Sequence, residues 1–237
     1  MKGKSKHKGG RRWVKWLFLG PLLAILLLQL YFFLMICWWS RVNPVMTSFM
    51  SAQLTELRQT NPKATLEQKW VPYAAISANL KRAVIASEDA NFAEHDGVDW
   101  EALQKAYERN TTRHKVTGGG STITQQLAKN LFLSGSRNYL RKGQEMVIAY
   151  MLETVLSKER ILEIYLNVVE FGRGVFGAEA AARHYFRAPA ANLTAAQSAR
   201  LAVMLPNPRY YDAHRSTNYL GRRTGVILNR MNSAELP

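Results

Sequence analysis

An apolar run near the N-terminus limits what this chain of 237 residues can fold into. The run covers Leu17–Trp39 and contains no charged side chain; its only interruptions are Gly20, Pro21 and Gln29. A helix of about 20 apolar residues crosses the roughly 30 Å of hydrocarbon in a membrane. Tryptophans favour membrane–water interfaces, and they lie at both ends of the run: Trp13, Trp16, Trp38 and Trp39. We therefore predict a transmembrane helix over 16–40.

A basic segment before this helix predicts its orientation. Residues 1–15 contain seven lysines and arginines and no acid, and such segments stay on the cytoplasmic side of a membrane. We therefore expect a cytoplasmic tail over 1–15, a single pass through the inner membrane, and export of everything after Arg41. A cleaved signal peptide is the alternative, but the run is too long for one and no small-residue cleavage site follows it.

The charge of the remaining chain indicates which partners to expect. The total of +15 includes the seven tail charges, which leaves +8 beyond them. Eight lysines and arginines but only one acid, Glu108, lie between Lys105 and Lys142. An exported domain meets anionic headgroups and lipid-linked pyrophosphate rather than DNA, so we expect no nucleic-acid partner. The single cysteine, Cys37, allows no internal disulfide, and no Cys/His cluster has metal-ligand spacing.

The chain beyond the anchor repeats apolar residues with the helical period and has almost no β-branched alternation. We predict an all-α fold, with a membrane-proximal amphipathic linker over 41–68 and one domain over 69–237. The expected helices are 73–88, 100–112, 122–132, 138–156, 158–169, 177–186 and 194–205. Expected helix N-caps are Asp99, Ser157 and Thr194. Pro206 and Pro208 are expected to end the last helix.

The stretch Glu88–Gly97 (EDANFAEHDG) places five ionisable side chains at the end of an apolar helical segment. A carboxylate that is partly removed from water has a raised pKa and can exchange protons near neutral pH. Glu88 is therefore a candidate general base. The alternative is an ordinary helix end followed by a charged turn. We interpret His95 as a hydrogen-bonded structural residue in preference to a ligand.

Three glycines, Gly118–Gly120, precede a helix that Ser121 or Thr122 is expected to cap. Glycines at such a place let backbone N–H groups face an anion, assisted by the helix dipole; a mobile loop is the alternative. One half of this helix carries hydroxyls, amides and one cation, which suit a sugar and a phosphate. These residues are Ser121, Thr122, Gln125, Gln126, Lys129 and Asn130.

The next helix presents Arg141 and Lys142, with Glu145 one turn beyond both cations. The two cations could grip a pyrophosphate, because arginine chelates phosphate with two N–H groups and lysine adds a point charge. Glu145 would then orient them or the reacting sugar. An intrahelical ion pair with no further role is the alternative.

Two further segments are interpreted as architecture. The segment Ile161–Asn167 has the apolar spacing of a core helix. Glycines in Gly172–Gly177 mark a turn, and because no strand is expected before it, the spacing does not indicate a dinucleotide site.

Five blocks, in this order, resemble the peptidoglycan glycosyltransferase family, and in particular its monofunctional biosynthetic members, which share this module with class A penicillin-binding proteins. The blocks are EDANFAEHDG from Glu88, GGSTITQQLAKN from Gly119, RKGQE from Arg141, ILEIYLN from Ile161 and ARLAVMLPNP from Ala199. The resemblance runs from about Val71 to Tyr211. Gln197 stands where the family is expected to carry glutamate.

The resemblance implies a lysozyme-like α-helical domain that polymerises lipid II into linear β-1,4 glycan strands, with inversion and release of undecaprenyl pyrophosphate. It implies Glu88 and Glu145 as catalytic residues. Substrate binding is implied for Asp89, Phe92, His95, Gly120, Ser121, Thr122, Gln125, Gln126, Lys129, Asn130, Arg141 and Lys142. The expected partners are lipid II, the lipid-linked glycan chain and the inner membrane, with other cell-wall synthesis or division proteins as candidates. No obligatory cofactor or metal site is expected; a divalent cation is a candidate stimulator.

Two alternatives remain from the sequence. A lytic enzyme of the same architecture would cut glycan, but it needs neither a pyrophosphate cluster nor an anchor on the lipid side. A non-catalytic membrane scaffold leaves Glu88 and the polar helix face unexplained. Because the chain ends at Pro237, we expect no transpeptidase domain.

Overall fold

The computed structural model describes residues 12–113, 120–133 and 138–237, so most of the expected tail and two of the three glycines, Gly118 and Gly119, lie outside the described residues. The predicted all-α fold is confirmed, since helices dominate the described residues and three short strands accompany them there. The helices are α1 (Arg12–Trp39), α2 (Ser48–Thr60), α3 (Ala78–Glu88), α4 (Trp100–Arg113), α5 (Ile123–Phe132), α6 (Tyr139–Val155), α7 (Lys158–Val168), α8 (Ala178–Phe186), α9 (Ala195–Met204), α10 (Pro208–Ala213) and α11 (Asn218–Arg230).

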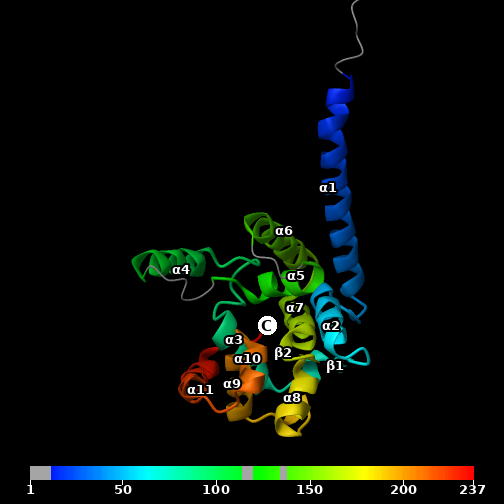
Figure 1. The fold of residues 1–237 in the computed structure, drawn as a ribbon. Helices are drawn as coiled ribbons and strands as arrows, with labels where there is room; N and C mark the ends of the chain where they lie inside the picture. The colour runs from blue at the N-terminus through cyan, green and yellow to red at the C-terminus, as the bar shows by residue number, and fades with distance from the viewer. Residues whose placement is uncertain (1–11, 114–119, 134–137) are drawn as a thin grey trace, which may run out of the picture.

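Helix α1 contains one apolar segment, Leu19–Trp39, that is long enough to cross a membrane, and it projects from the rest of the protein (Figure 1). Its C-terminal half is nevertheless packed against the domain. The rings of Phe32 and Trp39 lie 4.8 Å and 5.1 Å from that of Phe132 on α5. Arg160 on α7 donates to the carbonyl of Trp39 at 2.8 Å. The anchor is therefore joined to the helical domain by buried contacts.

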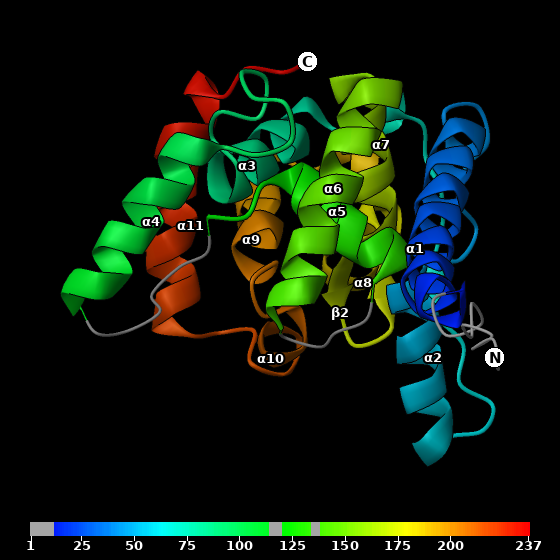
Figure 2. The ribbon, with the colours of Figure 1, turned by 90° about the horizontal axis from the view of Figure 1, so that it is seen from above.

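The helical domain has two groups of helices that meet near the end of α3. On one side α5 packs against α6, α7 and α2, and on the other α3 packs against α9 and α11; Figures 1 and 2 show the two groups from two directions. Fully buried side chains such as Leu127, Ile148 and Leu152 fill the first group. Each contributes about 1.5–3 kcal/mol through burial. This packing holds the ends of α3 and α5 in fixed positions.

Helix α3 carries the first motif and begins with a cap. Ser77 accepts a hydrogen bond from the N–H of Asn79, and the helix buries Leu80 and Val84 before it ends at Glu88. The predicted helix 73–88 is therefore too long at its N-terminus. Its first residues form a separate 3₁₀ turn (Tyr73–Ala75). The predicted caps Asp99, Ser157 and Thr194 each accept a backbone N–H three residues on.

The expectation of no strand before the glycine turn is wrong. A small sheet in the order β1-β3-β2 contains β1 (Glu67–Gln68), β2 (Glu170–Gly172) and β3 (Val175–Phe176). Strands β2 and β3 are antiparallel and form a hairpin, and Gly174 at its turn has φ of +78°. The turn itself is thus confirmed. Strands of two or three residues are too short for an alternating pattern to show in the sequence.

The C-terminal helices α10 and α11 were missed by the sequence pattern. Helix α9 ends at Met204, as the nearby prolines suggest, but Pro208 then begins α10. Proline is tolerated in the first helical turn because its missing N–H needs no intrahelical partner there. Helix α11 fully buries only Leu220 and Ile227, so its apolar pattern is weak.

Candidate active site

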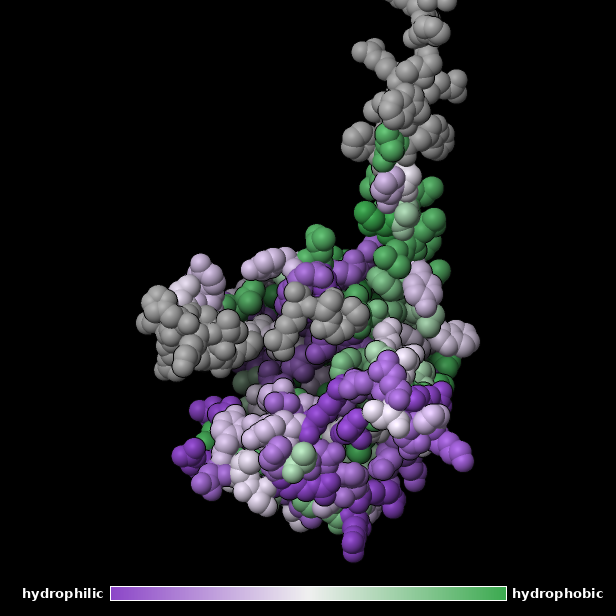
Figure 3. Space-filling model, viewed as in Figure 1, coloured by the Kyte–Doolittle hydropathy of each residue, from purple (hydrophilic) through white to green (hydrophobic). Residues whose placement is uncertain are grey.

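A pocket of about 400 Å³ lies where the end of α3, the start of α4 and the segment before α5 meet. Its lining residues are Glu88, Asp89, Ala90, Asn91, Asp99, Ala102, Gly120, Ser121 and Thr122. The molecular surface is hollowed between the part that carries α6 and the part that carries α9 and α11 (Figure 3). The fold thus brings the first two sequence blocks together around one cavity.

Glu88 is the last residue of α3, and its carboxylate faces this pocket. Its Oε2 accepts a hydrogen bond from Nε2 of Gln126 at 2.9 Å, and its Oε1 has only a weak contact with the Ser87 hydroxyl at 3.4 Å. Burial raises the pKa of Glu88 above its ordinary value of 4.5, and the charge of Asp89 adds to this effect. The two hydrogen bonds and the charge of Arg223 oppose it. Glu88 can therefore accept a proton more readily than an exposed glutamate.

Asp89 connects the first motif to α5. One carboxylate oxygen accepts the backbone N–H of Ile123 at 2.9 Å, and the other lies 2.9 Å from Nε2 of His95. Because Gly97 donates its N–H to Nδ1 of His95, the proton of this imidazole lies on Nε2 and is donated to Asp89. Asp89 and His95 thus fix the loop that follows Glu88.

Phe92 and His95 lie behind the pocket wall. Phe92 is completely buried, and the ammonium of Lys158 lies 4.7 Å from its ring centroid. Lys158 also donates to the carbonyl of His95 and to Glu153, which accepts the hydroxyl of Thr124 at 2.6 Å. The interpretation of His95 as structural agrees with these contacts. The expected substrate contacts of Phe92 and His95 do not agree with this arrangement, because the side chains of both residues are packed against protein.

The polar half of α5 faces protein for most of its length. Thr122 and Gln125 form a reciprocal capping box at the start of the helix, as the expected cap predicts. Both are buried, and so is Asn130. Gln126 reaches Glu88. Thr122 lines the pocket, whereas Gln125, Gln126 and Asn130 are not among its lining residues. The helical wheel alone could not distinguish such buried polar side chains from an open sugar-binding face.

Gly120 is needed because two backbones approach closely. A Cβ at this position would lie 2.9 Å from the Cα of Leu103 on α4. With Gly118 and Gly119 outside the described residues, the described glycine of this triplet serves packing against α4. Lys129 lies further along α5, with its ammonium 5.8 Å from the ring centroid of Phe49 on α2.

A basic cluster of Arg141 and Lys142 adjoins the pocket through Ser121. The Ser121 hydroxyl accepts from Nζ of Lys142 at 2.8 Å, and Gln125 accepts from the same ammonium at 3.1 Å. Glu145 is buried and pairs with both cations. Nε of Arg141 is buried and has no hydrogen-bond partner among the described residues. The intrahelical ion pairs are thus present, and they hold two cations beside the pocket.

Sequence reasoning did not assign three residues near Glu88. Tyr165 lies on α7, and its hydroxyl donates a hydrogen bond to Oε1 of Gln126 at 2.9 Å. Arg223 lies on α11, which the sequence pattern did not reveal. Asp99 was recognised as a cap, but it also lines the pocket and accepts from Asn91. A tyrosine between the apolar residues Ile164 and Leu166 of α7 was the available signal.

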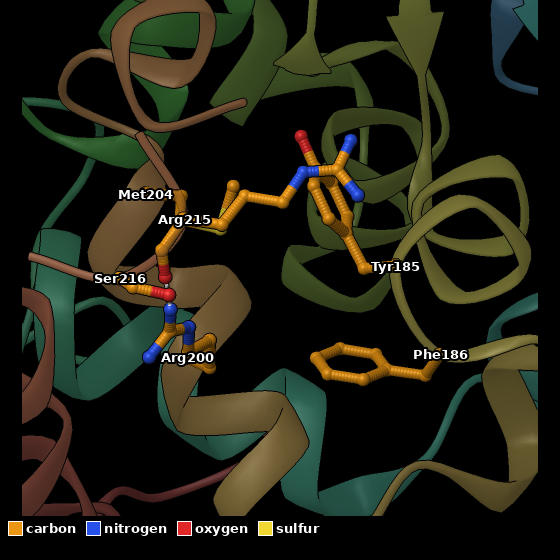
Figure 4. Close-up of a pocket in the computed structure, with 6 residues that line it drawn as sticks. All are labelled: Tyr185, Phe186, Arg200, Met204, Arg215 and Ser216. Carbon is orange, nitrogen blue, oxygen red and sulfur yellow. Dashed lines mark hydrogen bonds between the residues drawn. The ribbon is translucent and has the colours of Figure 1, made fainter. Parts of the chain in front are cut away.

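A second pocket lies beside the C-terminal half of α9 and is lined by Tyr185, Phe186, Arg200, Met204, Arg215 and Ser216 (Figure 4). Its cations already have protein partners: Arg200 donates to the carbonyl of Arg215, and Arg215 pairs with Asp212 at 2.7 Å. No carboxylate lines it. It therefore lacks the proton acceptor that distinguishes the pocket at Glu88. In the described part of the chain, no three His, Cys, Asp or Glu side chains are grouped to hold a metal ion.

Comparison with known proteins shows the family to which the chain belongs. The family model described as Transglycosylase matches residues 53–232. A biosynthetic peptidoglycan transglycosylase of Janthinobacterium sp. (strain Marseille) is 67% identical over 227 residues, covering 96% of this chain and 98% of that protein. The protein of the same name from Bordetella avium (strain 197N) is 58% identical over 92% of this chain and 94% of its own length. The chain therefore belongs to the transglycosylase family.

Proposed function

We propose that Glu88 is the general base with which this chain, a peptidoglycan glycosyltransferase, polymerises lipid II into linear β-1,4 glycan strands. The observation that carries the proposal is a partly buried carboxylate with a raised pKa at the end of α3, facing a pocket beside two cations. A lytic enzyme has no need of such cations. The full-length similarity to proteins named biosynthetic favours synthesis over lysis and over a non-catalytic scaffold.

The reaction is an inverting displacement. The acceptor 4-hydroxyl attacks the anomeric carbon of the donor sugar and passes its proton to Glu88. A new carbon–oxygen bond forms as the bond to the pyrophosphate oxygen breaks, and its electron pair leaves with undecaprenyl pyrophosphate. Because the α-linked donor becomes a β-linked product, the base and the pyrophosphate lie on opposite sides of the reacting sugar. The leaving group is already a stabilised anion, so no strong general acid is required.

Arg141 and Lys142 are the proposed pyrophosphate ligands. Glu145 keeps both cations in place before substrate arrives, which is the preorganisation that stabilises charge developing in a transition state. The unpartnered Nε of Arg141 offers a further N–H group. Ser121 lies between this cluster and Glu88 and is the proposed contact to the sugar. The ammonium of Lys129 lies beside the ring of Phe49 on α2. We assign Lys129 to the side of the substrate site that faces the lipid.

The single apolar helix near the N-terminus anchors the chain to a membrane. We place the tail in the cytoplasm and the catalytic domain in the periplasm. The exposed side chains Tyr139 and Leu140 at the start of α6 are suited to meet lipid at the same surface. Other cell-wall synthesis or division proteins stay candidate partners.

Labelled lipid II given to detergent-solubilised, folded protein tests this function. We expect a polymer that a muramidase degrades, and no cleavage of purified glycan strands. Absence of polymer, together with shortening of added glycan strands, would contradict synthesis and support the lytic alternative.

A further inference from the structure

We propose that Tyr165 is a positioning residue for the general base, acting on Glu88 through the side-chain amide of Gln126. The inference rests on the proposed role of Glu88 and adds a residue from α7 to the site. Tyr165 touches neither the pocket nor the basic cluster. Its effect on the reaction is through the orientation of one amide.

A chain of two hydrogen bonds links three helices at this point. The hydroxyl of Tyr165 (α7) donates to Oε1 of Gln126 (α5) at 2.9 Å. Nε2 of the same amide donates to Oε2 of Glu88 (α3) at 2.9 Å. Tyr165 is completely buried, so its hydroxyl has no access to water. A buried hydroxyl that loses its acceptor destabilises the folded protein, because water cannot replace the lost hydrogen bond.

The buried hydroxyl decides which way the amide points. If Gln126 were turned over, its N–H₂ group would face Tyr165, and the tyrosine proton would lose its acceptor, Oε1 of Gln126. The amide oxygen would at the same time face the Glu88 carboxylate, where two acceptors repel. Both costs favour the observed orientation, with the N–H₂ group on Glu88. An amide held this way favours the ionised, proton-accepting form of the base.

The electrostatic surroundings support this assignment. The titratable and charged groups that act on Glu88 are Asp89 on its own helix end, Arg223 on α11, and Tyr165 on α7. Burial raises the pKa of Tyr165 well above 10, and the carboxylates of Glu88 and Asp89 add to the effect. Tyr165 therefore keeps its proton throughout the working range and acts as a constant donor to Gln126.

The two oxygens of Glu88 are then unequal. Oε2 is occupied by Gln126, whereas Oε1 has only the weak 3.4 Å contact with Ser87. Oε1 is the oxygen left to take the acceptor proton. The amide thus fixes the rotation of the carboxylate and lowers its pKa against the effect of burial.

The test is the pH dependence of kcat for lipid II polymerisation in Tyr165→Phe, which keeps the ring and removes the hydroxyl. Without the fixed amide the pKa of Glu88 rises, so the acid limb of the profile moves to higher pH. A shift of about one unit, equivalent to about tenfold in kcat on the acid side, is expected. KM should change little, because no substrate contact is removed.

Two further variants distinguish positioning from general stability. Tyr185→Phe removes a similar hydroxyl-to-carbonyl bond of 2.9 Å, to Phe171, and should lower the melting temperature without moving the pH profile. Gln126→Ala should move the acid limb as Tyr165→Phe does, and the double variant should equal Gln126→Ala alone. The inference is overturned if the pH profile of Tyr165→Phe matches that of wild type. It is also overturned if the shifts caused by Tyr165→Phe and Gln126→Ala add in the double variant.

Glu88→Gln separates this inference from the proposed function. If Glu88→Gln is inactive while Tyr165→Phe keeps the wild-type profile, only the role of Tyr165 fails. If Glu88→Gln retains turnover, the base assignment itself is wrong.

Discussion

Two glutamates near the pocket have the same side chain and opposite surroundings. Glu145 is buried and forms ion pairs with Arg141 and Lys142. Glu88 has an amide and a weak hydroxyl contact but no direct ion pair, so its charged form is less favoured. Two carboxylates whose surroundings differ in this way commonly have separate tasks at an active site. In the mechanism that we propose, Glu88 exchanges the proton and Glu145 arranges the cations.

Glu88→Gln should stabilise the fold at neutral pH. A carboxyl group with a raised folded-state pKa stabilises the protein below its unfolded-state pKa, and that contribution is lost as pH rises through the folded-state pKa. The raised pKa of Glu88 therefore lowers the stability of the wild-type fold at neutral pH. Glutamine does not ionise, so the variant does not lose this stability. Thermal unfolding of both proteins should give a higher melting temperature for the variant at pH 7.5. The difference should shrink towards pH 4, and a lower melting temperature at pH 7.5 would contradict the assigned environment.

Arg141→Lys should lower polymerisation about tenfold, because a point charge cannot reproduce two N–H groups aimed at a pyrophosphate. The pairing with Glu145 can persist, so the melting temperature should change little. Arg183→Lys is a matched control, since Arg183 also pairs with a glutamate one turn away, Glu179. It should keep wild-type turnover. Equal rates for both variants would leave the basic cluster with a structural role only.

Residues whose role depends on local chain geometry could be predicted from the sequence. The end of α3 at Glu88, the cap at Thr122 and the pairing of Glu145 with Arg141 and Lys142 all lie within one or two helical turns. The contact of Tyr165 with Gln126 joins residues 39 positions apart. Such a contact depends on how α5 and α7 pack, which helical periodicity does not determine.

At the scale of elements, the loop after Glu88 is fastened to α5 at both ends. Asp89 accepts the N–H of Ile123, and the carbonyl of Gly97 accepts the hydroxyl of Thr122 at 2.6 Å. Gly97 has φ of +87°, a conformation that side chains with a Cβ rarely adopt. The loop therefore sets the distance between the base and the polar wall of the pocket.

Gly97→Ala should destabilise the protein by about 1–3 kcal/mol and lower turnover. The added Cβ would lie 3.1 Å from Cγ of Glu153 and 3.2 Å from the carbonyl oxygen of Ala149, so the loop must move away from α6. Gly221→Ala on α11 is the control, because its Cβ meets no atom within 4 Å and alanine favours a helix. Wild-type stability and rate in Gly97→Ala would show that the loop adapts freely.

Most of the elements that the sequence failed to reveal are short. Strands β1 and β3 contain two residues each, and α10 contains six. These elements are defined by pairing with segments far away in the chain. Longer helices with a continuous apolar side, such as α5 and α7, were located to within two residues.

At the scale of the whole molecule, the anchor and the domain form one packed unit. Ile36 is fully buried in α1, and Gln29 and Gln144 exchange two hydrogen bonds of 2.9 Å between α1 and α6. Arg160 binds the last turn of α1. These contacts fix the orientation of α1 relative to the domain, and in the proposed function they set how the domain meets the membrane.

Deletion of residues 1–40 should slow polymerisation in liposomes far more than in detergent. The anchor confines the enzyme to the plane of its substrate and raises the effective concentration. The melting temperature should also fall, because Phe132 loses its contacts with Phe32 and Trp39. Initial rates in both media measure the effect. Equal loss in liposomes and detergent would mean that the anchor acts through stability alone.

The central claim is that Glu88 accepts the proton in glycan synthesis. Polymerisation of labelled lipid II by Glu88→Gln, beside thermal protection of the same variant by undecaprenyl pyrophosphate, tests it most directly. We expect turnover lower by about 10²–10⁴-fold, the usual contribution of general base catalysis. Protection by undecaprenyl pyrophosphate should equal that of wild type, because the basic cluster is intact. Turnover within a few fold of wild type would contradict the claim.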